Sequence, residues 1–106
     1  ITQFLEDYSD GSPRATVVGR YPPNPWGVHD LAGNVQEWCS YFSAEYPAKA
    51  AVDPHGPPSG KDRVVRGSSW ASGNRYSIRC ARRQLYAPDV LNHRMGFRIA
   101  MSVPTQ

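Results

Sequence analysis

The sequence has no apolar run near the roughly 20 residues that a membrane-spanning helix needs, so it predicts no membrane span. Its start also lacks a basic region followed by an apolar stretch, so we expect a signal peptide to be absent or already removed. Only two cysteines occur, Cys39 and Cys80, and no Cys-x-x-Cys pair, which argues against a redox or zinc motif. A disulfide between them would indicate an extracellular or cell-surface protein, and reduced thiols a cytoplasmic one.

Regular secondary structure is also expected to be scarce. Ten Pro and nine Gly lie among the 106 residues, well above the combined usage of roughly 12% in average proteins. We therefore expect one loop-rich domain over residues 1–106. Such a domain buries little apolar surface, so it needs stabilisation by a metal ion, a disulfide or polypeptide outside this sequence.

Acidic side chains are scarce in the second part of the chain. Residues 1–62 carry four basic and eight acidic side chains, whereas residues 63–106 carry eight basic and one acidic. All eight of these basic residues are arginines, which favour planar, bidentate contacts. We expect most of them to face carboxylates and carbonyl groups of the first part. A net charge of +3 is small for a nucleic-acid-binding protein, so no nucleic-acid partner is expected.

A short amphipathic helix or helical turn is predicted over residues 28–42. The apolar residues there are spaced three, four, three and four positions apart: Val28, Leu31, Val35, Trp38 and Phe42. The Ala-Gly-Asn sequence at 32–34 interrupts this pattern, because glycine disfavours helix. Residues 1–27 end in Tyr-Pro-Pro-Asn-Pro-Trp-Gly and are predicted to be loop, because closely spaced prolines exclude helix.

Three short strands are predicted in the second part of the chain, over residues 63–66, 78–83 and 96–101. The turn-rich segment 47–62 precedes the first strand, and the polar segment 84–94 is predicted to be a loop between the other two.

Two carboxylates flank a Gly-Asn turn in the sequence His-Asp-Leu-Ala-Gly-Asn-Val-Gln-Glu-Trp at 29–38. Asp30 and Glu37 lie seven positions apart, and the turn between them can direct backbone carbonyl groups inward. Carboxylate and carbonyl oxygens are the ligands that calcium prefers, although the spacing is not that of an EF-hand loop. The residues alone leave two interpretations, a calcium site or a helix-capping Asp with a solvated Glu.

The segment Arg-Gly-Ser-Ser-Trp at 66–70 joins a predicted strand to a tight turn. Ser69 is not expected to be a nucleophile, because a catalytic serine needs a base and an orienting group, and the three histidines are scattered along the sequence. Residues 71–94 then mix Tyr, Arg, Asn and His. This composition suits a binding surface, and it equally suits an ordinary irregular surface loop.

Five motifs together resemble the C-terminal part of formylglycine-generating-enzyme domains. They are Pro-Pro-Asn-Pro-Trp-Gly at 22–27, Asp-Leu-Ala-Gly-Asn-Val-Gln-Glu-Trp at 30–38, Arg-Gly-Ser-Ser-Trp at 66–70, Arg-Cys-Ala-Arg-Arg at 79–83 and Gly-Phe-Arg-Ile-Ala at 96–100. Their order and spacing match over residues 10–101. The resemblance implies an irregular, loop-rich α+β variant of the C-type lectin fold, with the N-terminal part of the usual domain missing.

The resemblance also bears on metals. In the family, the positions that match Asp30, Gly33, Val35 and Glu37 ligate calcium, the Gly and Val through their carbonyl oxygens, so it implies a structural Ca²⁺ at these residues. The family's oxidase activity rests on a copper-binding cysteine pair just after the Gly-Ser turn. Here Ser72 occupies the first of those positions and the second has no cysteine. Hydroxyls are poor ligands for copper(I), so we expect no copper and no catalytic residue.

A related branch shares this C-terminal pattern. The variable proteins of diversity-generating retroelements display altered residues for binding between the Gly-Ser-Trp turn and the Gly-Phe-Arg ending. The chemically mixed positions 71–74, 82, 84–86 and 90–94 lie in that interval here. The resemblance therefore extends to that branch, with a surface diversified for ligand binding.

These observations lead to one expected function and two alternatives. We expect a non-catalytic display domain that binds a protein or another macromolecule through Trp70, Asn74, Tyr76, Arg82, Tyr86, Asn92, His93 and Arg94. One alternative is a sulfatase-modifying-type oxidase or related metal-dependent enzyme domain that is completed by polypeptide not present here. The other is a structural accessory domain. A missing N-terminal segment or a partner chain is expected to complete the domain in each case.

Overall fold

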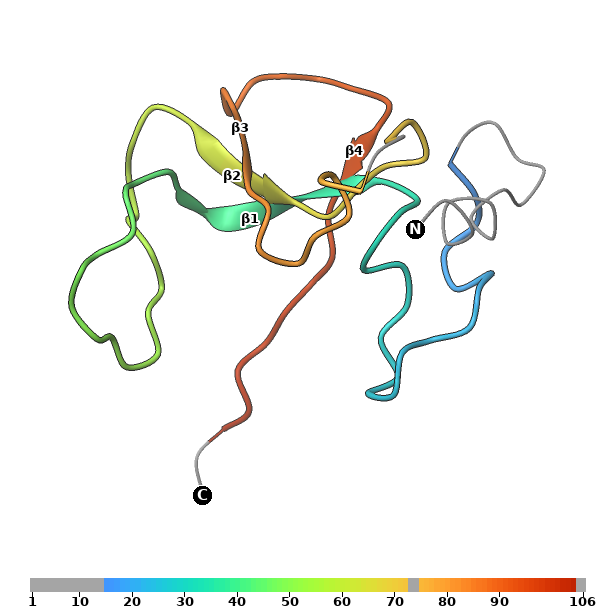
Figure 1. Ribbon diagram of the computed structural model, residues 1–106, viewed down its shortest axis with the longest axis horizontal. Helices are drawn as coiled ribbons and strands as arrows, with labels where there is room; N and C mark the ends of the chain where they lie inside the picture. Colours follow the sequence, from blue (N-terminus) through green and yellow to red (C-terminus); the bar gives the residue numbers. More distant parts are fainter. Residues whose placement is uncertain (1–14, 73–74, 105–106) are drawn as a thin grey trace.

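Four short strands form one sheet at the centre of the molecule (Figure 1). In the computed structural model, which describes residues 15–72 and 75–104, the strands are β1 (Gln36–Phe42), β2 (Arg63–Arg66), β3 (Gln84–Tyr86) and β4 (Met95–Gly96). The sheet order is β3-β2-β1-β4. The described residues contain no helix, so none there is long and apolar enough to cross a membrane. The expected loop-rich architecture is confirmed, whereas the helical component of an α+β fold is not seen in this part of the chain.

The helix or helical turn predicted over residues 28–42 is wrong. Residues 28–35 form a loop, and the strand β1 follows. Asp30, Gly33 and Asn34 have φ angles of 57°, 121° and 57°, which a right-handed helix does not allow. β1 instead pairs with a distant segment: Trp38 lies opposite Val65 in an antiparallel ladder with β2. This long-range pairing overrides the local spacing of the apolar residues.

The strand predicted at 63–66 is confirmed as β2, which lies between β1 and β3. Val64 and Val65 are 0% and 1% exposed. Because successive side chains of a strand point to opposite faces, the sheet is covered on both faces at β2. No other hydrophobic residue in the described ranges is buried to this degree, so the core is small. This agrees with the expectation that the domain buries little apolar surface.

The other two predicted strands differ from those observed. Residues 78–83 form turns, in which the Arg82 amide donates to the Arg79 carbonyl at 3.1 Å, so the strand predicted there is wrong. The third strand, β3, begins two residues after that turn, inside the segment predicted to be a loop, because Gln84 and Leu85 pair with β2. The strand predicted at 96–101 is present only at its start, where β4 pairs in parallel with β1.

Residues 97–104 run away from the sheet in an extended conformation (Figure 1). Apolar side chains recur at every second position of this segment and are more than three-quarters exposed: Phe97, Ile99, Met101 and Val103. The alternation is that of a strand with one apolar face, but within the described residues the segment joins no sheet beyond Gly96.

Arginines connect the loops to the sheet, and four of the eight in residues 63–106 bind carbonyl oxygens in the described structure. Arg63 donates to the Ser40 carbonyl at 2.9 Å, Arg66 to the Cys80 carbonyl at 3.0 Å and Arg83 to the Ala44 carbonyl at 3.1 Å. A hydrogen bond to the Tyr41 hydroxyl raises the pKa of Arg66 above its ordinary value. Only one ion pair with a carboxylate occurs in the described part of the chain, and it involves Arg98.

Candidate functional site

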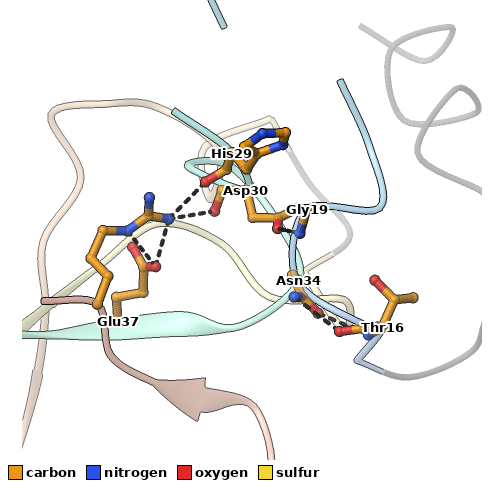
Figure 2. Close-up of polar contacts among 7 residues, drawn as sticks. Thr16, Gly19, His29, Asp30, Asn34 and Glu37 are labelled. Carbon is orange, nitrogen blue, oxygen red and sulfur yellow. Dashed lines mark hydrogen bonds and ion pairs between the residues drawn. The ribbon is translucent and has the colours of Figure 1, made fainter. Parts of the chain in front are cut away.

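The loop at residues 29–35, here called the anchor turn, holds together segments that are far apart in the sequence. The Asn34 side chain accepts a hydrogen bond from the Thr16 amide at 2.9 Å and donates to the Thr16 carbonyl at 3.3 Å (Figure 2). The Asn34 carbonyl accepts from the Trp70 amide at 2.8 Å. Asn34 adopts its positive φ readily, because Asn tolerates the left-handed region better than other non-glycine residues. The turn therefore joins the N-terminal loop to the turn after β2.

The two carboxylates of the expected calcium site face different partners. The Asp30 carboxylate accepts from the Gly19 amide at 3.0 Å, and Figure 2 shows it directed toward Gly19 and away from Glu37. Glu37, at the start of β1, pairs with Arg98: the Nε and Nη2 atoms of the guanidinium each lie 2.7 Å from Glu37 Oε1. Arg98 Nη2 also donates to the backbone carbonyls of His29, at 2.9 Å, and Asp30, at 3.2 Å.

These residues fit a hard cation by their chemistry. The side chains of Asp30 and Glu37 and the carbonyls of Gly33 and Val35 offer only oxygen atoms, which suit Ca²⁺. Gly33 is buried and Asp30, Val35 and Glu37 are partly buried, so these donors lie in or beside the anchor turn rather than on free side chains in solvent. In the arrangement seen here, a guanidinium group holds the position beside Glu37.

The turn after β2 carries two hydroxyl groups, those of Ser69 and Ser72. Ser69 and Ser72 are hydrogen-bonded to each other through Oγ atoms 3.4 Å apart, and Ser72 Oγ also accepts from the Ser69 amide at 2.9 Å. Ser69 Oγ accepts in turn from the Ala71 amide at 3.2 Å. These hydroxyls stabilise the turn, and no histidine is among their hydrogen-bond partners in the described ranges.

The structure brings one group of the predicted ligand-binding residues together beside this turn. The rings of Trp70 and His93 lie 5.5 Å apart between centroids and 36° from parallel. The indole Nε1 of Trp70 is buried and meets no acceptor in the described part of the protein. Next to His93, the Asn92 side chain accepts from the Arg94 amide at 2.9 Å and so shapes this loop. His93 and Arg94 are exposed.

The other predicted residues lie on the loops and strand that follow. Tyr76 is 56% exposed and has the guanidinium of Arg75 over its ring, 5.3 Å from the centroid. Arg82 lies 3.5 Å from the Ser77 hydroxyl. Tyr86 is half-buried on β3 and packs edge-on against Trp38, so part of its ring belongs to the core. Asn74 lies outside the described residues. We call residues 70–72 and 75–94 the display loops.

The start of β1 holds the display loops at both ends. The Trp70 amide bonds to the Asn34 carbonyl, and the Gln36 amide donates to the Arg94 carbonyl at 2.7 Å. The Gln36 side chain, only 8% exposed, bonds to the side chain of Gln84 on β3. The anchor turn and β1 therefore position the loops that carry the predicted ligand-binding side chains.

Both cysteines are free thiols in the structure. Cys39 is partly buried on β1, and this burial raises its pKa despite the opposing influence of the nearby Arg66 charge. Cys80 is exposed in the display loops. Neither thiol lies within the Ser69–Ser72 turn.

Sequence reasoning missed two residues of the site. Arg98 was expected only to face some carboxylate or carbonyl, and Asn34 was considered only as part of a turn. The sequence feature that could have identified Arg98 was its place in the Gly-Phe-Arg motif. For Asn34 that feature was the Gly-Asn pair, which favours positive φ. The partners of both residues lie far away in the sequence, so spacing alone could not identify them.

Comparison with known proteins agrees with these motifs. The profile of the sulfatase-modifying factor enzyme 1-like domain matches residues 2–103. The chain is 43% identical over 95 residues to the formylglycine-generating enzyme of Streptomyces coelicolor, covering 86% of this chain and 30% of that protein. It is 42% identical over 92 residues to the serine/threonine-protein kinase pkn1 of Chlamydia pneumoniae, covering 83% of this chain and 15% of the kinase.

A solved structure, Treponema denticola variable protein 1, has a similar fold. It superposes with a TM-score of 0.76 and 33% sequence identity, over 92% of this chain and 37% of that one. The chain thus spans less than two-fifths of each of these three proteins. Because the family profile covers nearly the whole sequence and the five motifs fall within it, the chain belongs to the sulfatase-modifying factor enzyme 1-like domain family.

Proposed function

We propose that this protein is a non-catalytic display domain: a calcium-supported, C-type lectin-like scaffold that binds a protein partner through its display loops. The observation that carries the proposal is the turn after β2. Ser72 is bonded to Ser69 there, and by the resemblance Ser72 stands at the first position of the oxidase's copper-binding cysteine pair, while the second position has no cysteine. The chain therefore keeps the turn as a structural element and lacks the groups that perform the oxidation.

The side chains around this turn support a binding role. His93, Arg94 and Tyr76 are exposed, and the indole Nε1 of Trp70 has no acceptor within the described ranges. Aromatic and arginine side chains are enriched at the energetically dominant positions of protein interfaces. The backbone that carries them is held by hydrogen bonds to the anchor turn and β1, so a ligand would meet a preorganised surface.

Calcium is proposed to support the same scaffold. Asp30, Gly33, Val35 and Glu37 would provide two carboxylates and two carbonyl oxygens, a donor set that suits this ion. An ion that binds only the folded state stabilises it by mass action, and the small core leaves room for such a contribution.

We further propose that the display loops are diversified in the manner of retroelement variable proteins. The similarity to Treponema denticola variable protein 1 supports this, as do the chemically mixed positions 71–74, 82, 84–86 and 90–94. Sequencing many copies of the gene from one population tests it. Substitutions concentrated at these positions, and absent from β1 and β2, are expected. An even spread along the chain would contradict diversification and leave the binding proposal standing.

The binding proposal is tested by capture experiments with matched variants. The protein is immobilised, and captured proteins from its source cells or their surroundings are quantified by mass spectrometry. The double substitution Tyr76→Ala and Arg94→Ala should abolish the capture of specific partners, because both side chains are exposed in the display loops. The control is Val52→Ala with Lys61→Ala, two exposed residues of the connection between β1 and β2. Equal capture by both double variants would overturn the proposal.

An assay for the oxidase alternative completes this test. A peptide that carries a sulfatase-type cysteine is incubated with the protein and copper, and aldehyde formation is followed with a hydroxylamine probe. We expect no aldehyde, because the sequence places no cysteine pair beside the Ser69–Ser72 turn. Aldehyde formation that survives removal of trace oxidase would restore the enzyme interpretation.

A further inference from the structure

We propose that Arg98 is a built-in cation of the anchor turn and that it competes with calcium for the carboxylate of Glu37. The arginine thereby lowers the calcium affinity of the site, and calcium binding releases the arginine. This inference rests on the calcium site proposed above and adds a residue that would regulate it.

The geometry that carries the proposal is a single guanidinium bonded to three acceptors. Its Nε and Nη2 atoms both lie 2.7 Å from Glu37 Oε1, and Nη2 reaches the carbonyls of His29 and Asp30 at 2.9 and 3.2 Å (Figure 2). The Glu37 carboxylate is the acceptor that the guanidinium shares with the proposed calcium site. The planar guanidinium, with its several donors, satisfies this carboxylate in the ion's place, and the His29 and Asp30 carbonyls hold it there.

The two cations would lie close together at the same carboxylate oxygen and would repel each other. A calcium ion lies about 2.3 to 2.6 Å from each oxygen ligand, so one bound at Glu37 Oε1 would approach the position of the Arg98 nitrogens, 2.7 Å from this atom. The net charge of the site also favours one cation over two. Asp30 and Glu37 together carry two negative charges, which one calcium ion neutralises, whereas calcium and Arg98 together would leave an excess positive charge.

Arg98 is free to leave when an ion arrives. Its side chain is 38% exposed, and the residues that follow it in the described chain extend away from the sheet. An exposed ion pair of this kind is worth little by itself, so a divalent cation with several oxygen ligands can displace it. By linkage, the free energy with which Arg98 weakens calcium binding equals that with which calcium weakens the Arg98–Glu37 pair.

Calcium titration of matched variants tests the competition. The dissociation constant is measured by isothermal titration calorimetry for the protein as it stands, for Arg98→Gln and for Arg83→Gln. Arg83→Gln removes the same formal charge from a side chain that stacks on Tyr46 instead. Arg98→Gln should tighten calcium binding by at least about fivefold, the lower end of typical coupling between linked groups. Arg83→Gln should change it by less than about twofold, because distant exposed charges are screened.

A second measurement follows Arg98 in the unsubstituted protein, so it does not depend on whether a variant folds. In the ¹⁵N-labelled protein, the Arg98 Nε–H resonance, identified by its loss in Arg98→Gln or by through-bond assignment, reports its hydrogen bond to Glu37. Calcium should shift this resonance toward that of a solvated arginine, with the same midpoint as the calorimetric titration. Magnesium, which keeps more of its water, should do so only weakly.

The outcomes separate the two proposals. Calcium binding of equal strength to the protein and to Arg98→Gln, with an unmoved Arg98 resonance, would overturn the competition and leave the calcium site standing. Weaker binding to Arg98→Gln would also overturn it, because the arginine would then support the site. No calcium binding to either protein would overturn both. Tighter binding to Arg98→Gln that is lost in Glu37→Gln would establish the competition.

Discussion

Two regions of the molecule differ in how they are stabilised. One is the anchor turn together with the sheet, and the other is the display loops. Val64 and Val65 on β2 are buried, and the Asn34 side chain and backbone bind two distant segments. In the display loops, Leu91 is 97% exposed and Tyr76 56% exposed, and the Asn92 and Ser72 side chains bond to near neighbours. The difference shows how a chain with a very small core can still present a defined surface: a few buried groups hold the ends of loops whose side chains remain available.

The largest effect is expected where the comparison is sharpest, in the core. Val65→Ala removes buried methyl groups from β2 and should lower the free energy of unfolding by about 2 kcal/mol. The matched change Leu91→Ala, at an exposed position of the display loops, should cost less than about 0.5 kcal/mol. Urea unfolding followed by circular dichroism measures both. Equal losses would mean that the display loops are packed as tightly as the sheet.

A smaller effect is expected at the anchor turn. Asn34→Gly keeps the positive φ but loses both side-chain hydrogen bonds to Thr16, so it should cost about 1 to 2 kcal/mol. Asn92→Gly removes a comparable side-chain bond, to the Arg94 amide in the display loops, where water can replace it, and should cost about half as much. Thermal unfolding of the two variants measures both losses of stability. A larger loss of stability for Asn92→Gly would contradict the role of Asn34 as the residue that holds the distant segments together.

Thiol reactivity gives a chemical version of the same comparison. Burial raises the pKa of Cys39, so less of it is thiolate at a given pH, whereas Cys80 is exposed. Iodoacetamide at mildly alkaline pH should therefore alkylate the exposed Cys80 faster than the partly buried Cys39. The Cys39 rate should continue to rise with pH above the usual range of thiols. Peptide mass spectrometry measures both rates, with Cys80→Ser as the control, and a faster Cys39 would contradict the burial argument.

The smallest effect on stability is expected in the display loops, at the two residues whose substitution is proposed to abolish partner capture. Tyr76→Ala combined with Arg94→Ala should change the free energy of unfolding by less than about 0.5 kcal/mol, because both side chains are exposed. Differential scanning calorimetry checks this. A large loss would show that these residues hold the loops in place, and the capture experiment would then need single substitutions.

Part of the fold was predictable from local sequence. The scarcity of regular structure followed from the proline and glycine content, and the strand at 63–66 from its valines flanked by polar residues. The predicted helix failed because the spacing of Val28, Leu31, Val35, Trp38 and Phe42 describes only a local pattern. The positive φ angles in the anchor turn and the pairing of Trp38 with Val65 decided the outcome.

The candidate site was predictable to a similar extent. The residue types around Asp30 and Glu37 suited either a calcium site or a helix-capping Asp with a solvated Glu, and the mixed composition of residues 71–94 suited either a binding surface or an irregular surface loop. The sequence did not show that Tyr86 packs against Trp38, or that Trp70 and His93 stack. These contacts join residues 48 and 23 positions apart, as the numbers of the two pairs show. Spacing rules cover only near neighbours.

The sequence by itself determined the family, the loop-rich character and the absence of a cysteine pair after the Ser69–Ser72 turn, because each depends on which residues are present and in what order. Only the tertiary structure decided which partners those residues meet. Glu37 and Arg98 are 61 positions apart, and they meet because β4 pairs in parallel with the start of β1 and carries Arg98 past Glu37. Sheet pairing is non-local, so the pairing of strands selects the partner of this carboxylate from among many arginines.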